Sequence, residues 1–165
     1  MGIERQAKEL ADVLASRQIR IVLAESCTAG LAAASLAQIP GISDWLCGSA
    51  VTYRDATKQA WLDVSASDLR DYSAVSEPVA VQMALGVLNL TAEADVSGSI
   101  TGHLGPGAPP ELDGVVYVAV ARREQDRSVL LEVQRVVLKS KKRPARQVEA
   151  AALLLDRVKY WIGKS

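Results

Sequence analysis

Three side chains that can take part in acyl transfer, Ser26, Tyr53 and Lys58, lie at or just after the ends of short apolar stretches. Ser26 follows residues 19–23, a β-branched stretch typical of a strand, and precedes an alanine-rich segment typical of a helix. A serine hydroxyl is a weak nucleophile until a base takes its proton, and a desolvated lysine can be that base. The pattern favours a serine nucleophile with Lys58 as its base, and with Tyr53 relaying or orienting the proton.

The turn after this strand offers a second element of such chemistry. Backbone N–H groups at the start of a helix stabilise an anion, so the turn residues Cys27, Thr28 and Gly30 are candidates for substrate binding. The glycine-rich loop at residues 101–107 is a second candidate for holding an oxyanion.

The same residues also have simpler interpretations. Taken alone, Ser26 is typical of a helix N-cap and Lys58 of a solvated helix residue. Cys27 is an alternative nucleophile, but the single histidine of the chain, His103, is far from it in sequence. We therefore expect Cys27 to be a buried, small apolar side chain.

Composition excludes several classes of protein. Nineteen basic and nineteen acidic residues cancel, which argues against a nucleic-acid partner. No stretch reaches membrane-spanning length and no signal core opens the chain, so we expect a cytoplasmic protein with no membrane partner. Two cysteines without a C-x-x-C motif indicate a reducing compartment, and one histidine excludes a His-rich metal site.

Strands and helices alternate along most of the chain. We expect strands at residues 19–23, 48–53, 95–100, 115–121 and 129–138, the last two as a hairpin. We expect helices at residues 3–14 and 30–36, around Lys58 and Trp61, from the N-cap Ser76 to Leu90, and at 146–161. This order predicts an α/β fold, a three-layer α/β/α sandwich with a mixed β-sheet, formed by residues 1–165 as a single domain.

In such sheets, ligands bind where strands end and helices begin. The predicted strand ends carry Ser26, the Tyr53–Lys58 segment and the loop at residues 101–107. We therefore expect these segments to surround one pocket.

Four segments, in this order, resemble the CinA C-terminal domain family. They are Ala-Glu-Ser-Cys-Thr-Ala-Gly-Leu at 24–31, Val-Thr-Tyr at 51–53 with Lys58, Ala-Val-Ser-Glu-Pro-Val at 74–79, and Ser-Ile-Thr-Gly at 99–102 with Gly105-Pro106. The characterised bacterial members are nicotinamide-nucleotide amidohydrolases, also called NMN deamidases. The likeness covers nearly the whole chain and is to the free-standing form, without the N-terminal domain of full-length CinA proteins.

The resemblance implies roles for individual residues. Ser26 would be the nucleophile, Lys58 its general base and Tyr53 a third catalytic residue. Thr101, Gly102 and Gly105 would line the substrate pocket, and Arg143 would contact the nucleotide phosphate. The implied reaction converts nicotinamide mononucleotide and water to nicotinate mononucleotide and ammonia, in pyridine nucleotide recycling. It needs no metal or organic cofactor.

The chain departs from the family pattern at three places around this pocket. Lys141-Lys142 replaces a Gly-Asp pair before Arg143, His103-Leu104 replaces small apolar residues, and residues 107–113 are rewritten. We expect His103 to contact the substrate. These changes keep two alternatives open: a ligand-binding or regulatory protein without the activity, and an amidohydrolase for another amide.

Aromatic residues are few, and several lie together near the C-terminus. Tyr160-Trp161-Ile162 and Trp45 predict apolar surface that would form a homodimer.

Overall fold

The computed structural model describes residues 2–164, and one five-stranded sheet forms its centre. The strands are β1 (Ile21–Glu25), β2 (Leu46–Val51), β3 (Val96–Gly102), β4 (Val115–Glu124) and β5 (Arg127–Val137), in the spatial order β2-β1-β3-β4-β5. Strand β1 pairs in parallel with β2 and β3, whereas β4 runs antiparallel to both β3 and β5. The predicted mixed α/β sheet is confirmed.

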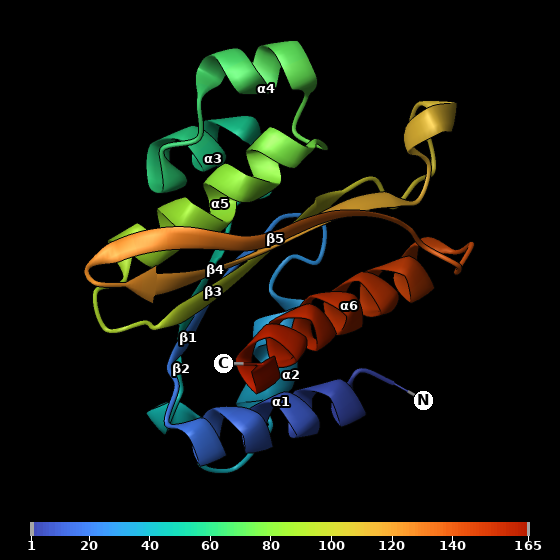
Figure 1. The fold of residues 1–165 in the computed structure, drawn as a ribbon. Helices are drawn as coiled ribbons and strands as arrows, with labels where there is room; N and C mark the ends of the chain where they lie inside the picture. The colour runs from blue at the N-terminus through green and yellow to red at the C-terminus, as the bar shows by residue number, and fades with distance from the viewer. Residues whose placement is uncertain (1, 165) are drawn as a thin grey trace.

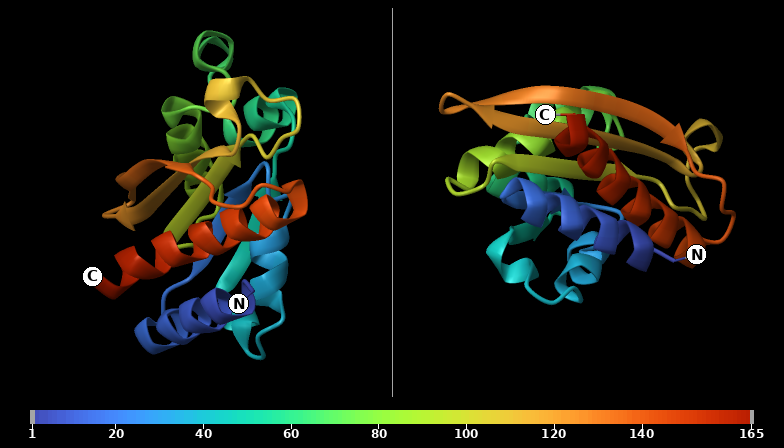
Figure 2. Two further views of the ribbon diagram at one scale, coloured as in Figure 1. Left: turned by 90° about the vertical axis from the view of Figure 1, so that its right-hand side faces the viewer. Right: turned by 60° about the horizontal axis from the view of Figure 1, so that its bottom comes forward.

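Helices cover both faces of the sheet, as Figures 1 and 2 show. They are α1 (Glu4–Arg17), α2 (Leu31–Ala37), α3 (Asp55–Leu62), α4 (Ala66–Tyr72), α5 (Glu77–Leu90) and α6 (Arg143–Lys164), with short 3-10 turns at Ile42–Asp44 and Pro110–Leu112. Helices α1, α2 and α6 form one layer, and α5 packs on the opposite face with α3 and α4 outside it. The helices on the two faces and the sheet between them form the predicted three-layer α/β/α sandwich.

Strand β1 is apolar except at its last residue, Glu25, because helices cover both of its faces. Ile21 and Leu23 belong to the core under α1, α2 and α6, whereas Val22 and Ala24 belong to the core under α5. A strand covered on both faces has no polar side, so it shows no alternation. The three parallel strands β1, β2 and β3 end at the same edge of the sheet, which brings their following loops together.

Several expected element boundaries differ from the structure. Strand β2 spans Leu46–Val51 rather than 48–53, which leaves Tyr53 in the loop before α3. Helix α4 was not expected, because Leu69 is its buried residue and a single apolar position gives no periodicity. Helix α6 begins at Arg143 rather than 146, and Pro144 is compatible with a first helical turn.

The predicted N-cap at Ser76 is correct in position but not in its hydrogen bond. Ser76 precedes α5, yet its hydroxyl donates to the Ser73 carbonyl at 2.8 Å instead of accepting from a helix amide. This serine therefore stabilises the turn before the helix.

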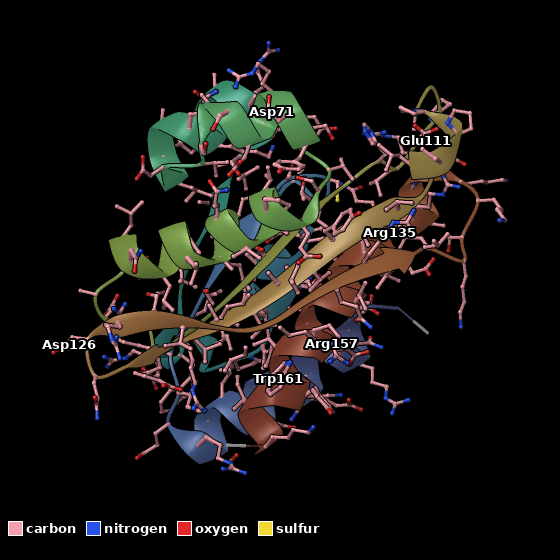
Figure 3. All side chains as sticks on the ribbon, turned by 45° about the horizontal axis from the view of Figure 1, so that its top comes forward. Asp71, Glu111, Asp126, Arg135, Arg157 and Trp161 are labelled. Atoms are coloured by element: carbon pink, nitrogen blue, oxygen red, sulfur yellow. The ribbon has the colours of Figure 1, made fainter. Side chains whose placement is uncertain are left out.

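The predicted aromatic surface near the C-terminus is wrong for most of its members. Ile162 is 1% exposed, Trp45 packs against the core, and the Trp161 indole donates to Glu132 on β5 at 3.0 Å. Figure 3 shows Trp161 and Arg157 together on α6, where Arg157 also pairs with Glu132. The cluster mainly fastens α6 to the β4–β5 hairpin, because helical spacing turns Trp161 and Ile162 inward.

None of the helices between residues 2 and 164 has the length and hydropathy needed to cross a bilayer.

Candidate active site

A cavity of about 270 Å³ opens where β1, β2 and β3 end. All the predicted site residues line it except Thr28 and Gly30: Ser26, Cys27, Tyr53, Lys58, Thr101, Gly102, His103, Gly105 and Arg143. The expected convergence of three segments on one pocket is confirmed.

Ser26 and Lys58 are in direct polar contact inside the cavity. Ser26 follows β1, and its backbone N–H donates to the Ile100 carbonyl on β3 at 3.0 Å, which fixes the turn. The Lys58 Nζ lies 3.0 Å from the Ser26 Oγ and 2.8 Å from the Thr52 carbonyl oxygen. The pair has the spacing that proton transfer between a hydroxyl and an amine needs.

The environment of Lys58 favours its neutral form. The side chain is 1% exposed, and burial lowers the pKa of the amine, although the negative charge of Asp55 opposes this shift. A neutral amine has a lone pair that can accept the serine proton. The interpretation of Lys58 as a solvated helix residue is therefore wrong.

Cys27 has the burial that the sequence predicts. It is 4% exposed, and burial raises the pKa of its thiol to about 12. Since the thiolate is the reactive species, this thiol is a poor nucleophile near neutral pH. The environment of the two side chains favours Ser26 over Cys27.

Tyr53 and Arg143 meet at the mouth of the cavity from distant parts of the chain. The Arg143 Nη2 donates to the Tyr53 hydroxyl at 2.8 Å, and its Nη1 donates to the Gly105 carbonyl at 2.6 Å. Both side chains are exposed, and Lys141 and Lys142 precede Arg143 at the surface. The rim therefore carries a fixed guanidinium suited to an anionic group.

The loop after β3 forms the opposite wall. The Thr101 hydroxyl donates to the Ala74 carbonyl at 2.8 Å, so it joins this wall to the segment before α5. His103 is half-buried, and its backbone exchanges two hydrogen bonds with Val115 and Gly114. His103 lines the cavity from a backbone held on both sides.

Arg146 holds this loop, and the sequence did not single it out. Its guanidinium is 5% exposed, donates to the carbonyls of Leu104 and Ser140, and forms two hydrogen bonds with the Asp113 carboxylate. This pairing lowers the pKa of Asp113. The spacing of Arg146 three residues after Arg143 is the signal that could have found it, because such residues share one side of a helix.

Gly105 depends on the same contact. Its φ is +66°, and a Cβ would lie 2.8 Å from an Asp113 oxygen and 3.0 Å from an Arg146 nitrogen. A larger residue would therefore push the loop away from Arg146.

Thr28 and Gly30 lie outside the cavity, around the buried carboxylate of Glu25. The Thr28 hydroxyl and the Gly30 amide both donate to Glu25 Oε2. The substrate-binding roles expected for them therefore have no support in the geometry, because their polar groups are taken. The signal that the sequence analysis missed is Glu25 itself. It is a carboxylate at the end of an apolar strand, five residues before Gly30, whose amide donates to it.

Across residues 2–164, no three His, Cys, Asp or Glu side chains gather closely enough to hold a metal ion.

A serine and a buried lysine at the carboxyl edge of parallel strands define this chain as an α/β protein with a serine–lysine pair in its cavity. The chain belongs to the CinA C-terminal domain family, whose sequence model matches residues 3–159. The predicted family is confirmed.

Proteins similar in sequence to this chain carry different names. The CinA-like protein of Chlorobaculum tepidum is 37% identical over 131 residues, which are 78% of this chain and 31% of that protein. The nicotinamide-nucleotide amidohydrolase PncC of Enterobacter agglomerans is 41% identical over 118 residues, 70% of this chain and 71% of that protein. The chain thus spans about a third of the CinA-like protein but most of the amidohydrolase.

Solved structures agree with the fold. A CinA superfamily protein from Klebsiella pneumoniae superposes with a TM-score of 0.89 at 27% identity, over 100% of both chains. One from Escherichia coli gives a TM-score of 0.83 at 30% identity, over 97% of this chain and 89% of that one.

Proposed function

We propose that this protein is an amidohydrolase that converts nicotinamide mononucleotide and water to nicotinate mononucleotide and ammonia. The observation that carries the proposal is the 3.0 Å contact between the Ser26 hydroxyl and the buried Lys58 amine inside the cavity. The similarity to an amidohydrolase of this name supports the choice of substrate.

The first half of the reaction forms an acyl-enzyme. The Ser26 Oγ attacks the carboxamide carbon while the neutral Lys58 amine accepts the hydroxyl proton. The resulting ammonium then gives a proton to the amide nitrogen, the carbon–nitrogen bond breaks and ammonia leaves. The Thr52 carbonyl, 2.8 Å from the Lys58 Nζ, keeps the amine directed at Ser26 throughout.

The oxyanion of this step needs backbone donors. The Gly30 amide donates to Glu25 and the Ala29 amide to the Ser26 carbonyl, so neither serves. The amide of Cys27, which directly follows the nucleophile and lines the cavity, is the donor we assign to the oxyanion.

Water completes the cycle. Lys58, neutral again, takes a proton from water as the water oxygen bonds to the acyl carbon. The ester bond to Ser26 then breaks, the Lys58 ammonium gives this proton to the Ser26 oxygen, and the new carboxylic acid releases its remaining proton to solvent. The products are the carboxylate of nicotinate mononucleotide and a restored serine hydroxyl. Arg143 at the rim holds the phosphate of the substrate during both halves, because its charge is available where the cavity opens.

A second candidate is hydrolysis of a different amide. His103 places an imidazole in a wall where the family has small apolar residues, so it reduces or reshapes the space for the substrate. A binding protein without activity is the remaining alternative, and ammonia release together with labelling of Ser26 separates the three.

The test is release of ammonia from nicotinamide mononucleotide by the purified protein and by Ser26→Ala. We expect the variant to lose at least about 10³-fold in kcat, because removal of a nucleophile costs this much or more in serine hydrolases. Ser35→Ala is the matched control, since Ser35 is similarly buried but its hydroxyl bonds within α2.

Labelling by a fluorophosphonate distinguishes the alternatives. Labelling of Ser26 without ammonia release indicates another amide substrate. If Ser26 is not labelled and no ammonia is released, the chain is a binding protein. An active Ser26→Ala variant would contradict the assignment of Ser26 as the nucleophile.

A further inference from the structure

The Glu25 carboxylate is the most completely bonded polar group near the site. Its side chain is fully buried at the end of β1. Five groups donate to it: Oε2 accepts from the Thr28 hydroxyl at 2.7 Å and from the Gly30 and Ala32 amides at 3.1 Å, and Oε1 accepts from the Ala33 amide at 3.0 Å and the Ser49 hydroxyl at 3.1 Å. A buried carboxylate is tolerated in a protein interior when its oxygens are satisfied in this way.

These bonds join three elements. Gly30, Ala32 and Ala33 belong to the start of α2, Ser49 belongs to β2, and Glu25 itself belongs to β1. The carboxylate thus supplies the negative charge that the first turn of α2 favours, and it ties that turn to the neighbouring strand.

Both members of the proposed catalytic pair are attached to these elements. Ser26 is the residue directly after Glu25. Lys58 is held by the Thr52 carbonyl, and the Thr52 amide donates to the Glu25 carbonyl at 2.9 Å. A shift of α2 or β2 relative to β1 would therefore change the distance between the Ser26 Oγ and the Lys58 Nζ.

We infer that Glu25 is a positioning residue that sets the serine–lysine geometry by holding β1, β2 and α2 together from inside. The inference rests on the proposed role of Ser26 as nucleophile. Glu25 lies outside the cavity lining, so it acts through the turn that carries Ser26. A displacement of the reacting atoms by about 1 Å can cost on the order of 10²-fold in rate, so such a residue affects turnover more than binding.

Glu25→Gln is the main variant because it keeps the shape and removes one acceptor. Whichever way the amide is placed, its NH₂ group meets a helix amide, from Ala33 on one side or from Gly30 and Ala32 on the other. We expect kcat to fall about 10- to 100-fold with KM within about twofold of the native value, as for loss of an interaction that acts in the transition state.

Ser49→Ala removes the link to β2 alone and leaves α2 capped. We expect a smaller loss of kcat, about 3- to 10-fold, again without a matching change in KM. Ser97→Ala is the control for stability, because its buried hydroxyl donates to the Ala84 carbonyl away from the cavity. Melting temperatures of all three variants show how much stability each loses.

The second readout is the rate at which a fluorophosphonate labels Ser26, which needs no amide substrate. The rate should fall in Glu25→Gln and Ser49→Ala but not in Ser97→Ala. If the native protein is labelled but releases no ammonia from nicotinamide mononucleotide, the proposed substrate is wrong and the labelling rates still test Glu25.

Three outcomes would overturn the inference. One is that Ser49→Ala and a folded Glu25→Gln both keep native kcat and labelling rates. Another is that they lose no more than Ser97→Ala at equal loss of stability. The third is that native Ser26 is neither labelled nor needed for turnover. If Glu25→Gln does not fold, Ser49→Ala decides alone.

Discussion

Lys58 carries its amine at the bottom of the cavity with hydrogen bonds to Ser26 and to a carbonyl, and with no carboxylate in direct contact among the described residues. An ion pair would keep the amine charged, whereas burial favours the neutral form. The proposed chemistry depends on this choice of neighbours.

The pH dependence of turnover follows from the lowered pKa of Lys58. The neutral base predominates above its pKa, so kcat/KM should rise with pH, and the midpoint of the rise should lie below 10.5, the ordinary value for a lysine. Lys58→Met should lose about 10²- to 10⁴-fold in kcat, and its kcat/KM should no longer rise with pH. Initial rates from mildly acidic to alkaline pH measure both effects. A flat native profile together with an active Lys58→Met would contradict the role of the lysine.

The hydrogen bond between Arg143 and Tyr53 links the rim to the proposed catalytic group. Arg143→Ala should raise KM through the lost phosphate contact, and it should also lower kcat because Tyr53 loses its partner. Tyr53→Phe removes the same bond from the other side. The fold-loss in kcat of the double variant should therefore be smaller than the product of the two single fold-losses. Independent losses in a complete double-mutant cycle would show that the bond has no part in turnover.

Among the elements, the loop after β3 depends on α6. Arg146 on the first turns of α6 binds Leu104, which precedes the rewritten residues 107–113, and Asp113, which is the last of them. The loop after β3 contributes His103 and Gly105 to the cavity, so α6 determines the position of this side of the cavity.

The salt bridge of this loop predicts how stability responds to acid. Arg146 lowers the pKa of Asp113 below its ordinary 3.8, so the pair stabilises the fold above that value and the contribution is lost as pH falls through the lowered pKa. Asp113→Asn should melt at a lower temperature than the native protein at neutral pH, and the difference should shrink below about pH 4. Thermal unfolding by circular dichroism at several pH values measures it, with Asp71→Asn as a control at an exposed pair on α4. An unchanged difference at low pH would exclude this ionisation as the cause.

The sequence predicts elements better than it predicts the contacts between them. Strands β1, β3, β4 and β5 and the meeting of Ser26, Tyr53 and Lys58 follow from local patterns and from the rule for strand ends. The roles of Glu25 and Arg146 were missed because they depend on partners in other elements. Spacing along the chain indicates which side of its element a residue lies on, but it does not identify those partners. Thr28 and Gly30 were misassigned for the same reason: their donors point to Glu25, inside the protein.

For the whole molecule, polar contacts between elements far apart in the sequence hold α6 in place. Helices α1 and α6 lie side by side, and Lys159 on α6 pairs with Glu9 on α1. Arg157 and Trp161, labelled on α6 in Figure 3, both donate hydrogen bonds to Glu132 on β5 and so tie the hairpin to α6. These contacts use most of the aromatic cluster that we expected at the surface.

The homodimer stays a prediction, as does the cytoplasmic location. Tyr160, 42% exposed, is the member of the C-terminal aromatic group that remains available for a partner. Light scattering should report about twice the chain mass of 17.6 kDa. A mass of one chain throughout the micromolar range would contradict the homodimer.

The contact of α1 with α6 has a consequence for synthesis on the ribosome. Helix α1 emerges first, and its neighbour on the sheet emerges only after every strand has been made. At about 5–20 residues per second, the buried side of α1 waits several seconds for its cover, a period in which a chaperone can bind it. Arg143 arrives with α6, and so does Arg146, which holds the loop after His103. A nascent chain therefore completes its binding cavity and the second half of its core in the same late event.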